Sequence, residues 1–348
     1  MVRRALVMVG FVLLTSGIAF CEATRSLRVS LAGDPATPFS VENLAGKMTV
    51  LAGDGDAVVA VATVHAESED LAAAMRFEQV TGKDGEPALR VRYPLDRHST
   101  IRYPSGGHTS VEYDSHRAKV SDTGGVLVYA DVEVTVPRRA VSATFRNFVG
   151  SLAADGVKGK VLLDTASGDI VARGLEGTVK ADSGSGAVRA EQIKGTLTCD
   201  TGSGSCQVSG FDGDALKLDS GSGAIRVSGA TAATIHADTG SGSIRIEHAD
   251  TGEFVGDSGS GTIEFEAVGT RLARITGDTG SGDIRLRLPA TSSFELVADQ
   301  GSGDLTCRFA DAQPIVKKRL VVGYRRGDGR IRIGLDTGSG DVSIEPAP

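Results

Sequence analysis

A five-residue phrase, Asp-[Thr/Ser/Gln]-[Gly/Ala]-Ser-Gly, recurs nine times in the last 185 residues of the chain. Successive copies lie 18 to 21 residues apart, except for a final interval of 37 residues. Self-similarity at a period near 20 residues is typical of a solenoid, in which each repeat buries its apolar face only by stacking on its neighbours. The repeated Asp residues are Asp164, Asp182, Asp200, Asp219, Asp238, Asp257, Asp278, Asp299 and Asp336.

Apolar residues recur at fixed offsets from each repeat Asp. Offsets +6 and +8 are apolar and offset +7 is mostly polar, as in Ile244, Arg245 and Ile246. This alternation predicts a half-buried strand after each turn, and inward residues at −3 and −1 predict a second strand before it. A third apolar column at +11 indicates a corner. We therefore predict an all-β fold, a parallel β-solenoid with coils of about 18–21 residues that is right-handed by default.

The repeated phrase is expected to form a tight turn. Glycine allows positive φ, and Asp, Thr and Ser side chains can bond to nearby backbone amides. We interpret the nine Asp residues as a structural column. Their carboxylates are expected to cap the turns and to pair with the arginines at +7, namely Arg189, Arg226, Arg245 or Arg285.

The chain divides into three expected parts. Residues 1–23 are a predicted signal peptide, 24–150 a less regular β region leading into the stack, and 151–348 the regular solenoid. The β region is expected to contain a short helix from Glu69 to Phe77 and a mobile, polar loop near 98–125. Thr144 to Ala154 resembles a degenerate first coil. A basic excursion near 311–332 is expected to form a hairpin close to the C-terminal cap.

The N-terminus predicts export. Arg3 and Arg4 precede an apolar run from Ala5 to Leu14 and a zone of small residues, the layout of a secretory signal peptide. We expect the protein in the periplasm, at the cell surface or secreted. Cys21 raises the alternative of a lipidated N-terminus, although Phe20 stands where such sites need a small residue. No other apolar run is long enough to span a bilayer, so no transmembrane segment beyond the signal peptide is expected.

Composition excludes one class of partner and favours thin, turn-dense β structure. The chain has 46 Gly, no Trp and only 5% aromatic residues. A net charge of −7 argues against nucleic-acid binding, which needs a basic surface to neutralise phosphates.

The repeated acids suggest two kinds of chemistry. Asp-Thr-Gly-Ser is the active-site phrase of pepsin-like aspartic proteases, but those enzymes need two facing loops, whereas this repeat predicts a ladder of acids. The Asp column could instead bind calcium, as Asp-bearing turns do in β-rolls, although the doubled Gly of that nine-residue pattern is missing. We therefore assign no catalytic, cofactor-binding or metal-binding residue and expect no cofactor.

Two cysteines stand at inward offsets of one coil, with Cys199 at −1 and Cys206 at +6. The strands that meet at the intervening turn should bring their side chains together. An oxidising compartment would favour a disulfide, and two buried free thiols are the alternative.

The chain resembles a family of bacterial β-strand-repeat proteins of unknown function described as adhesins. The matching segments are F-S-V-E-N-L-A-G-K-M-T-V, V-E-V-T-V-P-R-R, the serial D-T-G-S-G coils and the final G-L-D-T-G-S-G-D-V-S-I, within about residues 38–346. The resemblance implies an exported β-solenoid and supplies no catalytic residues.

The expected function is that of a non-enzymatic adhesin or cell-envelope scaffold whose partner is an envelope protein, a surface protein or a glycan. The alternatives are a calcium-binding β-roll-like surface protein and a glycan-active β-helix enzyme, which would need a cleft with clustered carboxylates.

Overall fold

The computed structural model describes residues 22–31, 34–82, 85–105 and 107–347. The chain forms two compact units, residues 1–186 and 187–348, which we call unit 1 and unit 2 and describe one at a time. The predicted signal peptide and Cys21 lie outside the described residues, apart from Glu22 and Ala23.

Unit 1 consists mainly of two ladders of paired strands. In order of pairing, the first contains β1 (Ala23–Leu31), β4 (Val58–Ala66), β10 (Val126–Pro137), β3 (Met48–Gly53), β12 (Leu152–Asp155) and β14 (Ile170–Arg173). The second contains β5 (Arg76–Thr81), β6 (Pro87–Arg92), β2 (Phe39–Ala45), β11 (Val141–Val149), β13 (Lys158–Thr165) and β15 (Glu176–Ser183). Pairing is antiparallel among β1, β4 and β10 and between β5 and β6, and it is parallel elsewhere.

Two degenerate coils open the parallel stack. Strands β11 and β12 lie parallel to β13 and β14, in line with the interpretation of Thr144 to Ala154 as a first coil. Strands β2 and β3 form an earlier coil with the same register, pairing Phe145 with Val41 and Leu152 with Met48. From the sequence, the segment of β2 and β3 was predicted only to form strands that lead into the stack.

The segment around 98–125 is not the loop that its polar sequence predicts. It forms β7 (Thr100–Arg102), β8 (His108–Tyr113) and β9 (His116–Ser121), with β8 and β9 joined as a hairpin. Tyr113 is fully buried, packs edge-on against Tyr93 and Phe148, and donates a hydrogen bond from its hydroxyl to the Val91 carbonyl at 2.6 Å. Tyr113, together with the buried Ala118 and Val120, therefore anchors a hairpin that is otherwise mostly polar.

The short helix expected from Glu69 is present but ends earlier. Helix α1 (Glu69–Ala74) begins after Ser68, whose hydroxyl accepts a hydrogen bond from the Leu71 amide at 3.3 Å. Phe77 belongs instead to strand β5.

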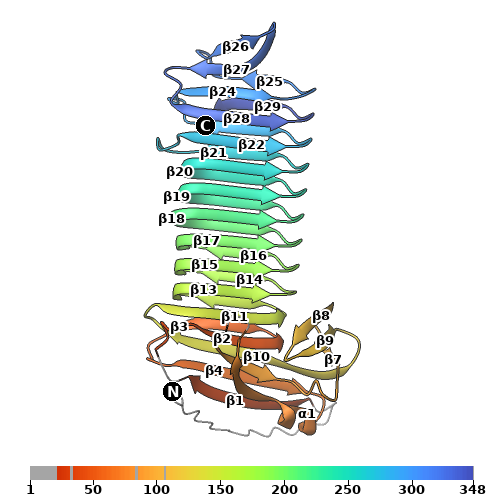
Figure 1. Cartoon of the computed structure of the whole chain (residues 1–348). Coiled ribbons are helices and arrows are strands. Elements are labelled where there is room, and N and C mark those ends of the chain that lie inside the picture. Colours follow the sequence, from red (N-terminus) through yellow and green to blue (C-terminus); the bar gives the residue numbers. More distant parts are fainter. Residues whose placement is uncertain (1–21, 32–33, 83–84, 106, 348) are drawn as a thin grey trace. The chain divides into compact units, whose positions relative to one another are not determined.

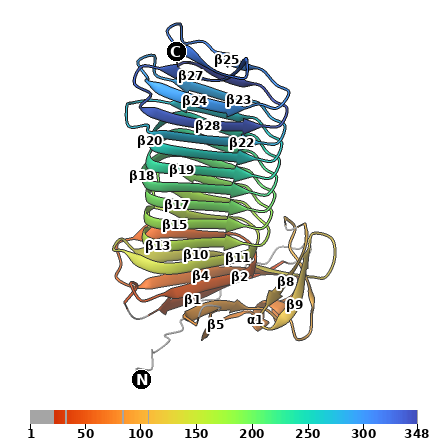
Figure 2. The ribbon, with the colours of Figure 1, turned by 45° about the horizontal axis from the view of Figure 1, so that its top comes forward.

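Unit 2 confirms the predicted parallel β-solenoid. Figures 1 and 2 show its strands stacked as successive rungs. They are β16 (Val188–Glu191), β17 (Lys194–Thr201), β18 (Cys206–Ser220), β19 (Ile225–Thr239), β20 (Ile244–Ser258), β21 (Ile263–Ala267), β22 (Arg274–Thr279) and β23 (Ile284–Leu288). Equivalent residues pair in parallel from coil to coil, as Ile225 does with Ile244. Side chains at the predicted inward offsets, including Ile244 and Ile246, are buried.

The coils turn a corner at offset +10, where the backbone adopts positive φ. Gly210 and Gly229 occupy this position, with φ of 66° and 68°. Gln192 and His248 adopt the same conformation without being glycine, with φ of 55° and 54°. The buried column predicted at +11, which includes Phe211 and Ala249, follows directly.

The last coils are stacked in a different order from the chain. The final strands are β24 (Phe294–Asp299), β25 (Leu305–Cys307), β26 (Gln313–Lys317), β27 (Leu320–Arg326), β28 (Ile331–Thr337) and β29 (Val342–Pro346). Strand β28 pairs in parallel with both β22 and β24, and β29 pairs with both β23 and β25. The chain thus builds the coil of Asp299, forms the β26–β27 hairpin beyond it, and returns to insert the coil of Asp336 between two earlier coils (Figure 1). The expected hairpin is present, but the inserted coil was not predicted.

Candidate functional site

In most turns of unit 2 the hydroxyl at offset +1, not the repeat Asp, bonds the backbone of its own turn and of the neighbouring turn; Gln300 replaces it in the coil of Asp299. Thr239 accepts a hydrogen bond from the Gly242 amide at 3.1 Å within its own turn and donates one to the Gly223 carbonyl of the preceding turn at 3.0 Å. Ser220, Ser258, Thr279 and Thr337 make the same two bonds and are buried. This column of hydroxyls was not predicted from the sequence, although Thr or Ser recurs directly after the Asp.

The glycines of the turns are required by close stacking rather than by positive φ. A Cβ on Gly223 would lie 1.9 Å from the Gly204 carbonyl oxygen, and one on Gly221 would lie 2.3 Å from that of Gly202. Neither glycine has positive φ. The expected reason for glycine was therefore wrong at these positions, because it is the neighbouring turn that leaves no room for a side chain.

In unit 2 most of the repeat Asp carboxylates do not cap their turns as expected; Asp299 is an exception, since it accepts a hydrogen bond from the Gly301 amide at 3.4 Å. Asp219, Asp238, Asp257, Asp278 and Asp336 pair in register from strand to strand. Within the described part of the chain these five carboxylates make neither a hydrogen bond nor an ion pair. Burial and the neighbouring carboxylates of Asp238 and Asp278 raise the pKa of Asp257. The column is thus a ladder of like charges about 4.8 Å apart.

Some acids at offset +5 do bond the backbone. The Asp283 carboxylate accepts a hydrogen bond from the Asp341 amide, and the Asp341 carboxylate accepts one from the Asp304 amide, both at 2.9 Å. Across the described residues, no group of three or more His, Cys, Asp or Glu side chains is placed to hold a metal ion.

The arginines at +7 lie on the strand after the turn and pair there, not with the Asp column. Arg245 forms ion pairs with Glu247 at 2.7 Å and with Glu264 at 3.2 Å. Arg285 pairs with Glu264 at 3.3 Å and with Asp283 at 2.6 Å. The predicted Asp–Arg pairing is therefore wrong, because the arginine lies before the corner of each coil and the Asp after it, near opposite ends of strands such as β19 and β20.

A shallow groove follows part of this arginine column. It has a volume of about 520 Å³, and its lining includes Arg189, Gln207, Arg226 and Arg245, which pair in register across neighbouring coils. Arg189 donates a weak hydrogen bond to Gln207 at 3.4 Å. Arg226 is exposed and has no ion pair with any described residue. Glu191 and Glu247 also line the groove, and Glu247 pairs with Arg245. The groove therefore presents guanidinium and amide donors along the direction in which the coils stack, with Arg226 as the arginine that has no ion pair among the described residues.

The two cysteines of unit 2 meet inside the coil as expected. Cys199 and Cys206 are both buried and both free thiols. A hydrogen bond with the Cys206 thiol, together with burial, raises the pKa of Cys199 well above its ordinary value. Cys206 also donates to the Asp219 carbonyl at 3.5 Å. Their contact is compatible with either alternative, so the disulfide stays a prediction.

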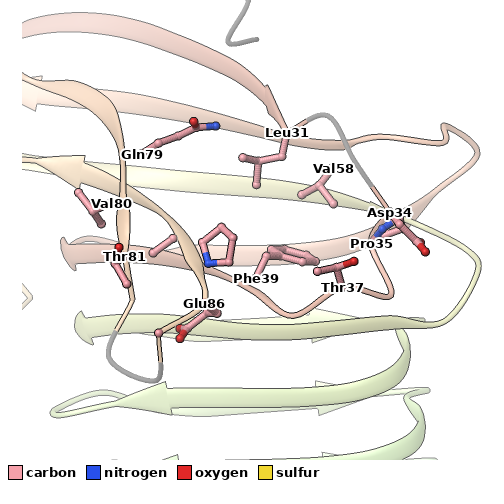
Figure 3. Close-up of a pocket in the computed structure, with 13 residues that line it drawn as sticks. Leu31, Asp34, Pro35, Thr37, Phe39, Val58, Gln79, Val80, Thr81 and Glu86 are labelled. Atoms are coloured by element: carbon pink, nitrogen blue, oxygen red, sulfur yellow. The ribbon is translucent and has the colours of Figure 1, made fainter. Parts of the chain in front are cut away.

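Unit 1 contains a pocket of about 390 Å³. Figure 3 shows Leu31, Val58 and Phe39 on one side of it and Val80 on another, with Glu86 at its edge. The lining combines apolar side chains such as Leu31, Phe39 and Val58 with polar ones such as Gln79 and Glu86.

A buried ion cluster lies beside this pocket. The Arg146 guanidinium contacts Glu86 at 3.6 Å, Glu42 at 3.4 Å and Asp164 at 3.1 Å, and Arg90 contacts Glu42 at 2.7 Å. The side chains of Glu42 and Arg146 are only 3% and 7% exposed. These charges neutralise one another inside the protein, so the cluster is built for stability and not as a pair of free catalytic carboxylates.

Comparison with known proteins places the chain in a family but reveals little about its chemistry. The sequence matches the family described as Toastrack DUF4097 over residues 70–345. No curated protein matches it in sequence. Among described residues, no helix is both long and apolar enough to cross a membrane.

Two solved structures are similar to the chain. One is described as a putative lipid binding protein from Parabacteroides distasonis, with 12% identity, a TM-score of 0.42, and coverage of 93% of this chain and 97% of that one. The other is described as a putative cell adhesion protein from Clostridium sporogenes, with 9% identity, a TM-score of 0.22, and coverage of 94% and 100%. At these levels of similarity, neither structure supports a conclusion about function.

Proposed function

This chain belongs to the Toastrack DUF4097 family, and we propose that it is an exported, non-enzymatic binding module of the adhesin or envelope-scaffold type. We further propose that its partner is an acidic glycan of the cell envelope. The Arg189–Gln207–Arg226–Arg245 row in the groove of unit 2 carries this proposal. A row of donors on four neighbouring coils suits a polymer, which presents its own groups at regular intervals.

The chemistry of the row favours an anionic polymer. A guanidinium group offers a planar fork of donors that matches a carboxylate or phosphate group bidentately. Arg226 has its fork free among the described residues, and Gln207 and Ser228 add neutral donors and acceptors suited to hydroxyl groups. The groove is shallow and open, as expected for a site that holds a long chain rather than one enclosing a reacting bond.

A binding assay tests the partner. The mature protein should bind alginate, an acidic polysaccharide, more tightly than neutral dextran, and this binding should weaken as salt is added. Arg226→Gln should weaken alginate binding about tenfold, because a lost charged hydrogen bond costs about 1.5–3 kcal/mol. Lys217→Gln is the matched control, since Lys217 is equally exposed but lies after the corner of its coil, on the side of the Asp column. Equal binding by both variants, or no preference for alginate over dextran, would contradict the proposal.

Two further measurements test export and the absence of catalysis. Fractionation of the native cell and N-terminal sequencing should find the protein outside the cytoplasm, without roughly its first 19–23 residues. A cytoplasmic form that retains Met1 would contradict export. Release of reducing ends from the polysaccharide during the binding assay would instead support the glycan-active enzyme.

A further inference from the structure

The exposed apolar side chains of the described residues gather at one end of unit 2. Six large aliphatic residues are exposed, and four of them lie on or beside the β26–β27 hairpin: Val297, Val316, Leu320 and Val321. Leu320 is 70% exposed and Val316 is 56% exposed. Scattered surface aliphatics are ordinary, but a cluster marks an interaction surface.

The same hairpin is strongly basic. Residues 313–326 contain Lys317, Lys318, Arg319, Arg325 and Arg326 and no acidic residue, in a chain whose net charge is −7. Arg326 pairs with Asp311 at 2.6 Å and lies over the Phe309 ring, and Arg325 approaches Glu295 at 3.8 Å. These contacts fix the base of the hairpin against its own unit.

The three cations at the tip of the hairpin do not make contacts of this kind. Lys317, Lys318 and Arg319 are exposed and make no ion pair with the described residues. Lys318 and Arg319 form the two-residue turn with φ of 48° and 70°, a conformation that Asn-Gly would adopt with less strain. The tip therefore presents three cations beside Val316 and Leu320.

An acidic groove lies next to the tip. Gly323 of β27 pairs with Val297 of β24, and the preceding residues 320–322 of β27 line this groove. The groove has a volume of about 870 Å³, and its lining includes the carboxylates of Asp278, Asp299, Asp304 and Asp336 and the side chains of Val297, Leu320 and Val321. Lys317 lines it too, but forms no ion pair with these acids.

We propose that the groove holds the hairpin tip of a second copy of this chain, in a two-fold symmetric dimer. One surface carries both a basic, apolar tip and an acidic, apolar groove, so a two-fold axis places each tip in the partner's groove. Opposite charges and matching apolar side chains then meet twice. This interface gives a partner to the unpaired cations, the unpaired acids and the exposed aliphatics together.

Two other occupants fit less well. Strand addition to the outer edge of β26 is hindered by Pro314, which lacks the amide needed for pairing. An anionic bilayer would attract the tip but repel the four carboxylates beside it. The dimer is independent of the glycan groove, which lies before the corner of each coil.

Charge reversal tests the proposal with the mature full chain. Light scattering during gel filtration should show a dimer at low salt that dissociates as salt is added. A tip variant (Lys317→Glu, Lys318→Glu and Arg319→Glu) and a groove variant (Asp278→Lys, Asp299→Lys, Asp304→Lys and Asp336→Lys) should each be monomeric. Mixed in equal amounts, they should form a heterodimer, because each tip then meets a groove of opposite sign. Lys217→Glu, remote from the hairpin, should dimerise like the unaltered chain.

Further measurements separate the alternatives. Leu320→Ser should weaken dimerisation at least about a hundredfold, since the two-fold interface loses the same buried aliphatic contact twice. Thermal midpoints equal to that of the unaltered chain establish that each variant is folded. A chain that is monomeric at low salt, or a mixture that fails to pair while both folded variants remain monomeric, overturns the proposal. So does tip-dependent co-sedimentation with phosphatidylglycerol vesicles by a chain that does not dimerise.

Discussion

The column of side chains at the position of the repeat Asp is neutralised by ion pairs in unit 1 but consists of acids alone in unit 2. In unit 1 the position of the repeat Asp is occupied by Glu42, Arg146, Asp164 and Asp182, paired in register. Arg146 binds the acids on either side of it, and Lys180 binds Asp182 at 2.8 Å. In unit 2 the column runs through acids alone, and most of them lack an ion pair among the described residues. The backbone register is the same, so the coil does not require the charge.

The column beside it shows what the coil does require. In unit 2 the Thr239 hydroxyl donates to the Gly223 carbonyl of the neighbouring turn. In unit 1 the Asn147 amide, at the equivalent offset, donates to the Gly46 carbonyl at 2.8 Å. Both units thus keep a polar group that satisfies buried turn carbonyls, as buried backbone groups demand. The inner column is structural, and the outer column is left for surface chemistry.

The largest expected effect comes from breaking the neutralised column. Arg146→Met should lower the free energy of unfolding by about 3 kcal/mol, because it leaves buried carboxylates with a weaker set of partners. Lys158→Met is the control, since Lys158 pairs with Glu176 at 2.8 Å but both side chains are about half exposed and such pairs contribute about 0–1 kcal/mol. Urea unfolding followed by circular dichroism measures both. Similar losses in the two variants would mean that burial of the cluster does not matter.

A glycine-to-alanine exchange tests whether the turns of unit 2 are more tightly stacked than the first turn of unit 1. Ala166 occupies the first glycine position of a turn in unit 1, where the turns of unit 2 have glycine. Gly221→Ala should cost about 2 kcal/mol, because its Cβ would lie 2.3 Å from the Gly202 carbonyl oxygen. The reverse change, Ala166→Gly, should alter the thermal midpoint little. A small effect of Gly221→Ala would show that the stack relaxes easily.

The cysteine pair offers a third contrast. Leu163 and Ile170 stand in unit 1 at the offsets that Cys199 and Cys206 occupy in unit 2. Exposure to oxidised glutathione should close a disulfide and raise the free energy of unfolding by about 2 kcal/mol, because it constrains a short loop of the unfolded chain. Non-reducing peptide mapping identifies the bond. Free thiols at both positions after oxidation would establish the pair as simple buried side chains.

The smallest expected effect concerns the unpaired ladder. The raised pKa of Asp257 means that the folded state holds this proton more tightly than the unfolded state, so stability falls as pH rises from about the ordinary value through the raised one. Asp257→Asn should therefore stabilise the protein at neutral pH, by about 0.5 kcal/mol after allowance for solvent screening. The gain should shrink at lower pH and in high salt. Asp182→Asn, which removes the partner of Lys180, should not stabilise, and an equal gain there would refute the contrast.

Much of the coil could be predicted from the sequence because its period is strict. Constant offsets identified the inward residues, including Ile244 and Ile246, since only one face of each strand can be buried. The same offsets predicted that the side chains of Cys199 and Cys206 lie close together. The candidate groove was only partly predictable. The arginines at +7 were recognised, but their ion partners were not, because offsets along the chain do not say which strand of the coil lies within reach.

Other features depend on long-range packing that has no local signal. The polar residues near 98–125 suggested a loop because only a few buried side chains, Tyr113, Ala118 and Val120, hold the hairpin in place. The glycines of the turns were expected to provide positive φ. The actual requirement is the close approach of the neighbouring turn, which exists only once the coils have stacked.

The sequence by itself therefore determined the class of fold, the strand positions, the inward columns and the presence of a basic hairpin, since all of these follow from local periodicity and charge. Tertiary structure alone decided that the coil of Asp336 lies between those of Asp278 and Asp299. Coils that share one repeat can stack on one another in any order, so the repeat does not specify the order. Tertiary structure also decided which charges are neutralised. Arg146 lies between Glu42 and Asp164 only because strands far apart in sequence become neighbours. In unit 2 the neighbours in register of Asp238, Asp257 and Asp278 are other repeat Asp residues.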